Sequence, residues 1–543
     1  MKKRLWFVAS LCLVSILTVQ CGGTPTPAPS APVSAPTAQS APVEGGTLIV
    51  AIPSDASSFD PNQLRESGTW RVMAQVFDTI VEEDDAGGKV NPALAEKWDV
   101  SADGLVYTFF LRKGVKFHDG TPFNAEAVKY TIDRQIVPEH PHYKDGDWNL
   151  ARLLLWPIKN VEVVDEYTVK INLKEPVAPF LTWMGTYASF IVSPASVEKY
   201  GKDVINHPAG TGPFKLVSWE RGQRIVLEKN PDYWGGAPKI DKLILLPILE
   251  GQGRLQALEA GTVQMMLDVP VDNADKLKSD PRFQVFQAKT RQIWHLGLNE
   301  KRVPAFKDKR VRQAVNYAIN KDVIVKDVLK GFGEVAISPF STSFGPWYTA
   351  DVTKYNYDPE KAKKLLAEAG YANGFEVTCN TPETGFAVQQ PVAMLQVIQS
   401  NLAAVGITMK IQTLEFATYM SRYQFGDYEM TMRAYYSNQS DPDNYLTNLH
   451  HSRQQPKPEG NGGLDTGYYV NPEVDKLIDA QRKELDVQKR IALVHQAIKL
   501  IVDDAPWAYV DHMLDVHVAT KNVKGVVMHP QAVVDFRKAY IEK

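Results

Sequence analysis

Apolar residues recur along the chain at two spacings, one typical of strands and one typical of helices. Short apolar or alternating runs predict strands, and these lie at residues 47–52, 107–111, 168–173, 239–247 and 293–299. Apolar residues three or four positions apart predict helices at residues 359–369, 390–404 and 487–502. The two kinds of element are mixed, without an internal repeat of about 20 to 50 residues. This pattern predicts an α/β fold and argues against a solenoid or a propeller.

The helix expected at residues 359–369 carries its own start and stop signals. Asp358 is a suitable N-cap, because its carboxylate can accept a hydrogen bond from a backbone N–H of the first turn. Pro359 suits the first helical position, where an N–H has no partner within the helix. Gly370 is expected to end the helix.

The N-terminus has the pattern of a secretory signal. Three cations at residues 2–4 precede an apolar stretch at 5–19, which is too short to span a membrane comfortably. Cys21 follows and resembles a bacterial lipoprotein processing site, although Gln20 stands where a small residue is usual. We expect residues 1–20 to be a signal peptide and Cys21 to be lipidated. The alternatives are a secreted protein with an incidental cysteine, or an uncleaved signal that stays as an anchor.

A linker separates this signal from the body of the chain. Residues 24–44 contain six prolines, with alanine, serine and threonine as the main neighbours. Such a segment cannot bury enough apolar surface to fold, and it favours extended conformations. We therefore assign residues 21–46 to a lipidated cysteine plus a Pro/Ala/Ser-rich tether.

Composition narrows the classes of function. The chain has 543 residues and a formal net charge of −3, with no run of basic residues, so a nucleic-acid partner is not expected. Its three cysteines are Cys12, Cys21 and Cys379, so the body has one thiol and no internal disulfide. The body is long enough for two large lobes with well-formed cores.

Four sequence blocks follow one another along this body. They are 94–134, which contains FFLRKGVKFHDGTPF; 210–234, which contains GTGPF and NPDYW; 254–261, which reads RLQALEAG; and 306–331, which contains DKRVRQAVNYAINKD. In order and spacing they resemble the peptide- and nickel-type extracellular solute-binding proteins of ABC importers, often called family 5. The ordered set, which spans nearly the whole body, carries the resemblance.

The resemblance implies a two-lobed α/β fold of the periplasmic-binding-protein type, in the type II large cluster with an extra subdomain and a hinged cleft. Lobe 1 is expected at 47–292, with an inserted subdomain at about 82–200. The hinge crossing is expected at 293–299 and lobe 2 at 300–514. Residues 515–543 are expected to return to lobe 1 and complete it. Closure of the lobes would bury a ligand between them.

The resemblance also implies a function. The protein is expected to be an exported monomer, periplasmic or at the cell surface and anchored by Cys21. It would capture a small ligand and deliver it to the permease subunits of an ABC importer. We expect no catalytic residues, no cofactor and no metal site.

The segment 433–444 is the first candidate for ligand contact. In relatives that bind peptides, this place carries an Asp that neutralises the α-amino group of the peptide, and here the position falls on Asn438. A neutral amide cannot offset a buried ammonium, which disfavours free peptides. Asp441 is a second candidate, and it can instead serve as a cap of the next helix.

Six aromatic residues lie in segments expected to line the cleft or the hinge: Trp70, Trp294, Trp347, Tyr348, Tyr435 and Tyr436. Of these, Trp70, Trp294, Tyr435 and Tyr436 are the candidates for ligand contact. Flat rings stack on sugar faces and on peptide side chains alike. We expect an oligopeptide as the ligand, with an oligosaccharide as the main alternative, followed by opines, other small solutes or a metal complex.

Other motifs admit a chemical interpretation that we do not favour. His118 and Asp119 fall far short of a metal ligand set, and adjacent His450 and His451 point apart. Residues 210–213 lack the pattern of a phosphate loop, so we expect a close backbone crossing there. An exported hydrolase remains the alternative of a different class, although the chain has no G-x-S-x-G or H-E-x-x-H motif.

Overall fold

The computed structural model describes most of the chain from Gly45 to Glu542. The described residues are 45–63, 67–84, 89–148, 154–383, 390–437, 439–457 and 463–542. The predicted signal peptide, Cys21, almost all of the linker and Asn438 lie outside these residues. The body Pro42–Lys543 forms one compact unit and is described by itself.

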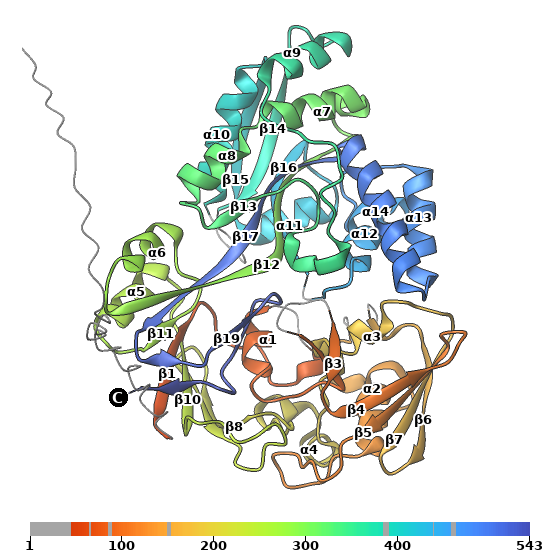
Figure 1. Ribbon diagram of the computed structural model, residues 1–543, viewed down its shortest axis with the longest axis vertical. Helices are drawn as coiled ribbons and strands as arrows, with labels where there is room; N and C mark the ends of the chain where they lie inside the picture. The colour runs from red at the N-terminus through yellow and green to blue at the C-terminus, as the bar shows by residue number, and fades with distance from the viewer. Residues whose placement is uncertain are drawn as a thin grey trace, which may run out of the picture. The chain divides into compact units, whose positions relative to one another are not determined.

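A mixed sheet, eleven-stranded in the described part of the chain, runs through the body (Figure 1). Its order is β15-β14-β16-β12-β17-β11-β1-β10-β9-β8, and β13 pairs with β17. The strands are β1 (Thr47–Ile52), β8 (Phe214–Glu220), β9 (Arg224–Lys229), β10 (Lys242–Pro247), β11 (Met265–Met266), β12 (Phe283–Leu298), β13 (Gly333–Val335), β14 (Phe375–Pro382), β15 (Ile407–Leu414), β16 (Met430–Tyr436) and β17 (Trp507–Thr520).

A second sheet has its own hydrophobic core. It has the order β4-β5-β7-β6 and buries Phe109, Val169 and Ile171. Its strands are β4 (Ala95–Val100), β5 (Val106–Leu111), β6 (Ile158–Asp165) and β7 (Thr168–Leu173). Three two-stranded sheets pair β2 (Val81–Glu83) with β3 (Val90–Pro92), β18 (Val523–Lys524) with β21 (Tyr540–Ile541), and β19 (Val527–His529) with β20 (Val533–Asp535).

Helices flank these sheets. In the first half of the chain they are α1 (Ser67–Met73), α2 (Ala125–Ile136), α3 (Phe180–Trp183), α4 (Pro194–Tyr200), α5 (Gly251–Glu259) and α6 (Val271–Lys278). In the second half they are α7 (Lys309–Ala318), α8 (Lys321–Val323), α9 (Pro359–Glu368), α10 (Pro391–Ala403), α11 (Phe416–Gln424), α12 (Asp443–His450), α13 (Pro472–Lys483) and α14 (Val487–Asp504).

The buried apolar residues divide the body into two lobes. One core cluster takes all its buried members from residues 293–510, which we call lobe 2. The other three clusters take theirs from residues 48–283 and 516–539, with Phe332 as the exception, and we call this part lobe 1. The two long strands β12 and β17 run side by side through both lobes and make the two crossings (Figure 1). The lobe limits given by the sequence stay a prediction, and this division of the cores supports them.

Local sequence signals are confirmed where they depend on neighbouring residues. The bounds of β1 and β7 agree with the prediction residue by residue. The carboxylate of Asp358 accepts a hydrogen bond from the backbone N–H of Lys361 at 2.9 Å, as expected of the N-cap of α9. The strand expected at 293–299 is longer: β12 already begins at Phe283.

The glycine-rich segment 210–213 is a close backbone crossing, as predicted. A Cβ atom at Gly212 would lie 2.5 Å from the carbonyl carbon of Val76, so only glycine fits there. The ring of His118 lies 2.9 Å from the carbonyl oxygen of Gly212 through Nε2. Burial lowers the pKa of His118 to about 4, so the ring is neutral at pH 7. The neutral ring stabilises the crossing by hydrogen bonding to its backbone.

Candidate functional site

The crossing strand β12 is irregular at the boundary between the lobes. Its pairing with β17 shifts register between Lys289 and Ile293. The hydroxyl of Thr290 donates to the carbonyl oxygen of Met513 at 2.7 Å. Ser341 and Ser343 both donate to the carbonyl oxygen of Thr290 at 2.9 Å. These bonds satisfy the backbone that the bulge leaves out of the ladder.

A buried carboxylate of lobe 1 contacts both the crossing strand and lobe 2. Glu83 lies on β2, and its side chain is 3% exposed. Oε2 lies 2.9 Å from Nη1 of Arg291, which is fully buried. Oε1 accepts hydrogen bonds from the backbone N–H of Ser440 at 2.8 Å and from its hydroxyl at 2.7 Å. We call Glu83, Arg291 and Ser440 the interlobe clamp, because these three residues join the lobes through charge and directional bonds.

Aromatic side chains surround this clamp. Trp70 and Tyr187 pack edge to face with ring centroids 5.4 Å apart. Both line a small cavity of about 90 Å³ together with Glu83 and Gln531. The hydroxyl of Tyr436, from β16, donates to the carbonyl oxygen of Gln531. The structure therefore brings Trp70 and Tyr436, two of the predicted residues, to the boundary between the lobes.

Three other predicted residues, Trp294, Tyr435 and Asp441, are held within lobe 2. Trp294 is 1% exposed and belongs to its core cluster, while the hydroxyl of Tyr435 donates to Oδ1 of Asn444 at 2.8 Å. Asp441 is 1% exposed, and both its oxygens lie 2.6 Å from the guanidinium of Arg490. Such a bidentate pair satisfies the carboxylate and favours a structural role for Asp441. Ligand contact by any of these residues stays a prediction.

A cluster of charged groups lies near Tyr436, which also interacts with Arg291 of the clamp. Nη1 of Arg71 on α1 lies 2.7 Å from Oδ2 of Asp268 and Nη2 lies 3.8 Å from Asp515. Burial raises the pKa of Asp515 to about 7, although Arg71 opposes the shift. Burial would also raise the pKa of Asp268, but Arg71 and His517 more than offset it and hold that pKa below its usual value. The cluster thus holds charge of both signs, with Asp515 buried, Arg71 nearly so and Asp268 partly exposed.

Asp511 is a different kind of buried acid. It lies on β17 next to Trp294 in the ladder and is fully buried. Neither carboxyl oxygen has a hydrogen-bond partner among the described residues. Burial therefore raises its pKa to about 8, so the carboxyl group is protonated at neutral pH.

The paired histidines have no metal-like surroundings. His450 packs against Trp507 with ring centroids 4.5 Å apart, and burial lowers its pKa to about 3. Within the described residues, no group of three or more His, Cys, Asp or Glu side chains is placed to hold a metal ion. No helix in the described part of the chain has the length and apolar character needed to cross a membrane.

The sequence did not single out Arg71, Glu83 or Arg291. Each is an ordinary charged residue without a local motif, and its partner lies far away in the chain. Glu83 and Ser440 are separated by 357 residues. Only the pairing of distant segments in the fold brings these groups together.

Comparison with known proteins identifies the family of this chain. A model of the bacterial extracellular solute-binding proteins, family 5 Middle, matches residues 89–457. The chain belongs to this family. It is therefore a solute-binding protein of an ABC importer, and the predicted two-lobed α/β fold of this family is confirmed.

Relatives within family 5 cover nearly the whole chain. Heme-binding protein A of Haemophilus influenzae is 33% identical over 497 residues, which cover 87% of this chain and 88% of the relative. Di/tripeptide-binding protein 2 of Pseudomonas aeruginosa is 31% identical over 512 residues, covering 91% and 95%. The structure of DppA from Helicobacter pylori with the peptide STSA is 31% identical, with a TM-score of 0.77, and covers 92% and 99%. These relatives are binding proteins, and members of the family act in the periplasm or outside the cell.

Proposed function

We propose that this protein captures a short peptide between its two lobes and delivers it to the permease of an ABC importer, without changing it chemically. The interlobe clamp carries the proposal. Its carboxylate, Glu83, belongs to lobe 1, while Ser440 belongs to lobe 2 and Arg291 to the crossing strand. Contacts of this kind exist only when the lobes are closed, so they contribute to the closed state that holds a ligand.

The charges at the lobe boundary favour a peptide over a neutral sugar. A short peptide is a zwitterion, and each of its ends needs a counter-charge when it leaves water. Arg71 and Arg291 supply positive charge there, and Glu83 and Asp268 supply negative charge. These groups pair with one another. When a peptide binds, its ammonium group can replace an arginine in such a pair, and its carboxylate can replace an acidic side chain. Two of the relatives compared above are named for a di/tripeptide or were solved with a peptide.

Native mass spectrometry of the purified protein tests this function. A retained peptide of unchanged mass, together with a thermal shift on adding a di- and tripeptide pool, is the expected result. Retention of an oligosaccharide, an opine or a metal complex would overturn the peptide assignment. Hydrolysis of the pool would overturn the binding function and favour an exported hydrolase.

Asn438→Asp tests whether this position contacts the ligand. We expect the change to strengthen binding of peptides with a free amino group about tenfold, because a carboxylate pairs with the ammonium where an amide cannot. The same peptides with an acetylated amino group are the matched control and should bind no better. Calorimetric titration measures both. Equal affinities of variant and wild type for the free-amine peptides would place Asn438 away from the ligand.

We also propose that the protein is exported and anchored to the membrane through a lipid on Cys21. Cys21→Ser should move the protein from the membrane fraction to the soluble exported fraction, because the acylated thiol is lost. Cys379→Ser is the matched control, since Cys379 is a buried free thiol in lobe 2. Fractionation followed by immunoblotting measures the distribution. A Cys21→Ser protein that stays in the membrane fraction would show that the uncleaved signal is the anchor.

A further inference from the structure

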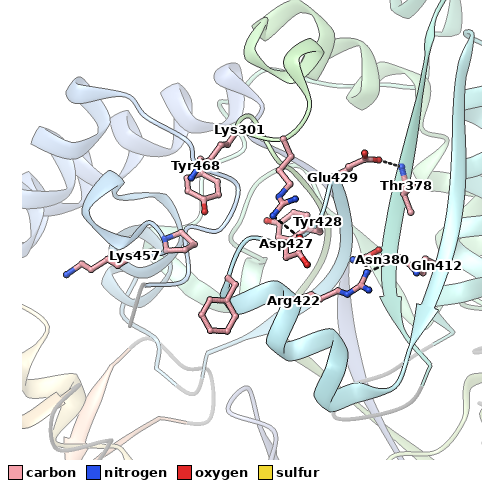
Figure 2. A pocket seen from close by; sticks show the side chains of 13 residues that line it. Lys301, Thr378, Asn380, Gln412, Arg422, Asp427, Tyr428, Glu429, Lys457 and Tyr468 are labelled. Atoms are coloured by element: carbon pink, nitrogen blue, oxygen red, sulfur yellow. Dashed lines mark hydrogen bonds and ion pairs between the residues drawn. The ribbon is translucent and has the colours of Figure 1, made fainter. Parts of the chain in front are cut away.

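Lobe 2 contains a large cavity that is separate from the interlobe clamp. Its volume is about 860 Å³. Among the described residues, those that line it all fall between Lys301 and Tyr468, and none of them comes from lobe 1. Figure 2 shows the side chains that face it from α11, from β14 and β15, and from the loop before β16. Movement of the lobes therefore leaves the walls of this cavity together.

The carboxylates that line the cavity are already satisfied. Asp427 pairs with Nη2 of Arg302 at 2.7 Å. Oε2 of Glu429 accepts a hydrogen bond from the backbone N–H of Thr378 at 2.6 Å, as Figure 2 shows. Asp427 is thus paired with a cation, and Glu429 is bound by a backbone N–H.

Three further cations of the lining have no such partner. Lys301, Arg422 and Lys457 form no ion pair with a carboxylate in the part of the chain that the structure describes. The guanidinium of Arg422 donates to Oε1 of Gln412 at 3.2 Å, which uses one of its five N–H donors. The cavity consequently has an excess of positive charge, which attracts an anion.

A buried amide points to the place where such an anion binds. Asn380 on β14 is 5% exposed and lines the cavity. No side-chain hydrogen bond joins Asn380 to another described residue, so its amide can donate to a ligand in the cavity. Figure 2 shows this amide next to the side chains of Arg422 and Gln412. A guanidinium beside an amide matches the donors that a carboxylate or phosphate group requires.

Aromatic rings also line the cavity. Tyr468 has φ of +61°, a left-handed conformation that costs a residue with a side chain about 1 to 3 kcal/mol. Its ring lies against Gly426, where a Cβ atom would come within 2.7 Å of it. Nζ of Lys301 lies 4.5 Å from the ring centre. Phe425 also lines the cavity and is 51% exposed, so its ring is accessible to a ligand.

We propose that this cavity is a second binding site, for a small organic anion with a carboxylate or phosphate group and a flat apolar part. The acidic group binds at Arg422 and Asn380, and the apolar part packs against Phe425 and Tyr468. The site is independent of the peptide proposed for the interlobe cleft, because its described lining residues all belong to lobe 2.

Calorimetric titration at low salt with phenyl phosphate and with benzoate tests the site, and the two probes distinguish phosphate from carboxylate. Wild type should bind at least one of them with a Kd of about 1 mM or tighter, and binding should weaken as salt is added. Arg422→Gln should weaken it about tenfold. Lys476→Gln, which removes an exposed cation elsewhere on lobe 2, should leave it unchanged.

Two further variants make the outcome decisive. Lys301→Gln should also weaken binding of the anion. This variant takes the place of Arg422→Gln if Arg422→Gln does not fold. Glu83→Gln should leave anion binding unchanged, because Glu83 belongs to lobe 1. Failure of both probes to bind at about 10 mM, equal binding by the Arg422 or Lys301 variant, or loss of binding in Glu83→Gln would overturn the second site.

Discussion

Glu83→Gln should shift the protein toward an open arrangement of its lobes and weaken retention of its ligand about tenfold or more. The substitution keeps an oxygen that can accept from Ser440, but it removes the negative charge that lies 2.9 Å from Arg291. Loss of one partner of a buried ion pair costs about 3 to 5 kcal/mol. Opening the lobes exposes Arg291 to water and relieves this cost. The substitution therefore destabilises the closed state more than the open state.

Small-angle scattering and ligand retention measure this opening. The radius of gyration of Glu83→Gln should rise, and retained ligand detected by native mass spectrometry should fall. Glu96→Gln is the matched control, because Glu96 is an exposed acid of lobe 1 that lies 3.8 Å from Arg112. An unchanged radius and unchanged retention in Glu83→Gln would show that the interlobe clamp does not hold the lobes together.

Asp511→Asn should stabilise the protein at neutral and alkaline pH. The carboxyl group of Asp511 is fully buried without a hydrogen-bond partner among the described residues, and burial raises its pKa from 3.8 to about 8. The folded state therefore binds this proton more tightly than the unfolded state. The resulting contribution to stability is complete below about pH 4 and is lost as the pH rises toward 8. Asparagine has nearly the same shape but does not titrate, so the variant does not lose this contribution to stability as the pH rises.

Chemical unfolding at several pH values checks the sign of this effect. The gain in stability of Asp511→Asn over wild type should grow by about 1.4 kcal/mol per pH unit between pH 5 and pH 8. Asp327→Asn, a change at an exposed acid of lobe 2, should show a constant difference across this range. Parallel pH profiles of Asp511→Asn and wild type would mean that Asp511 is not a buried acid of raised pKa.

Short-range features of the fold could be predicted from the sequence because they depend on neighbouring residues. The cap at Asp358 and the bounds of β1 are examples. The burial of Trp294 could not be predicted in the same way, because it depends on which face of β12 meets the core of lobe 2. Predicting a ligand contact at Asp441 from its segment left out Arg490, a partner 49 residues away that satisfies its carboxylate.

The interlobe clamp could not be predicted from the sequence either, because it also depends on contacts between distant segments. Its members have unremarkable surroundings in the chain, and their charges matter only because the fold buries them. Family motifs identify the scaffold, since they reflect turns and packing common to its members. The chemistry of the site arises from contacts between segments that those motifs do not contain.

The paths of β12 and β17 through both lobes also set an order in which the protein can fold. Lobe 2 takes its core from one continuous stretch, residues 293–510, and all of it leaves the ribosome before the chain ends. Lobe 1 needs Val516, Val518, Val534 and Phe536 to complete its cores. Lobe 1 therefore cannot finish folding until the last segment arrives, so the two lobes complete their cores at different times and lobe 2 can fold first.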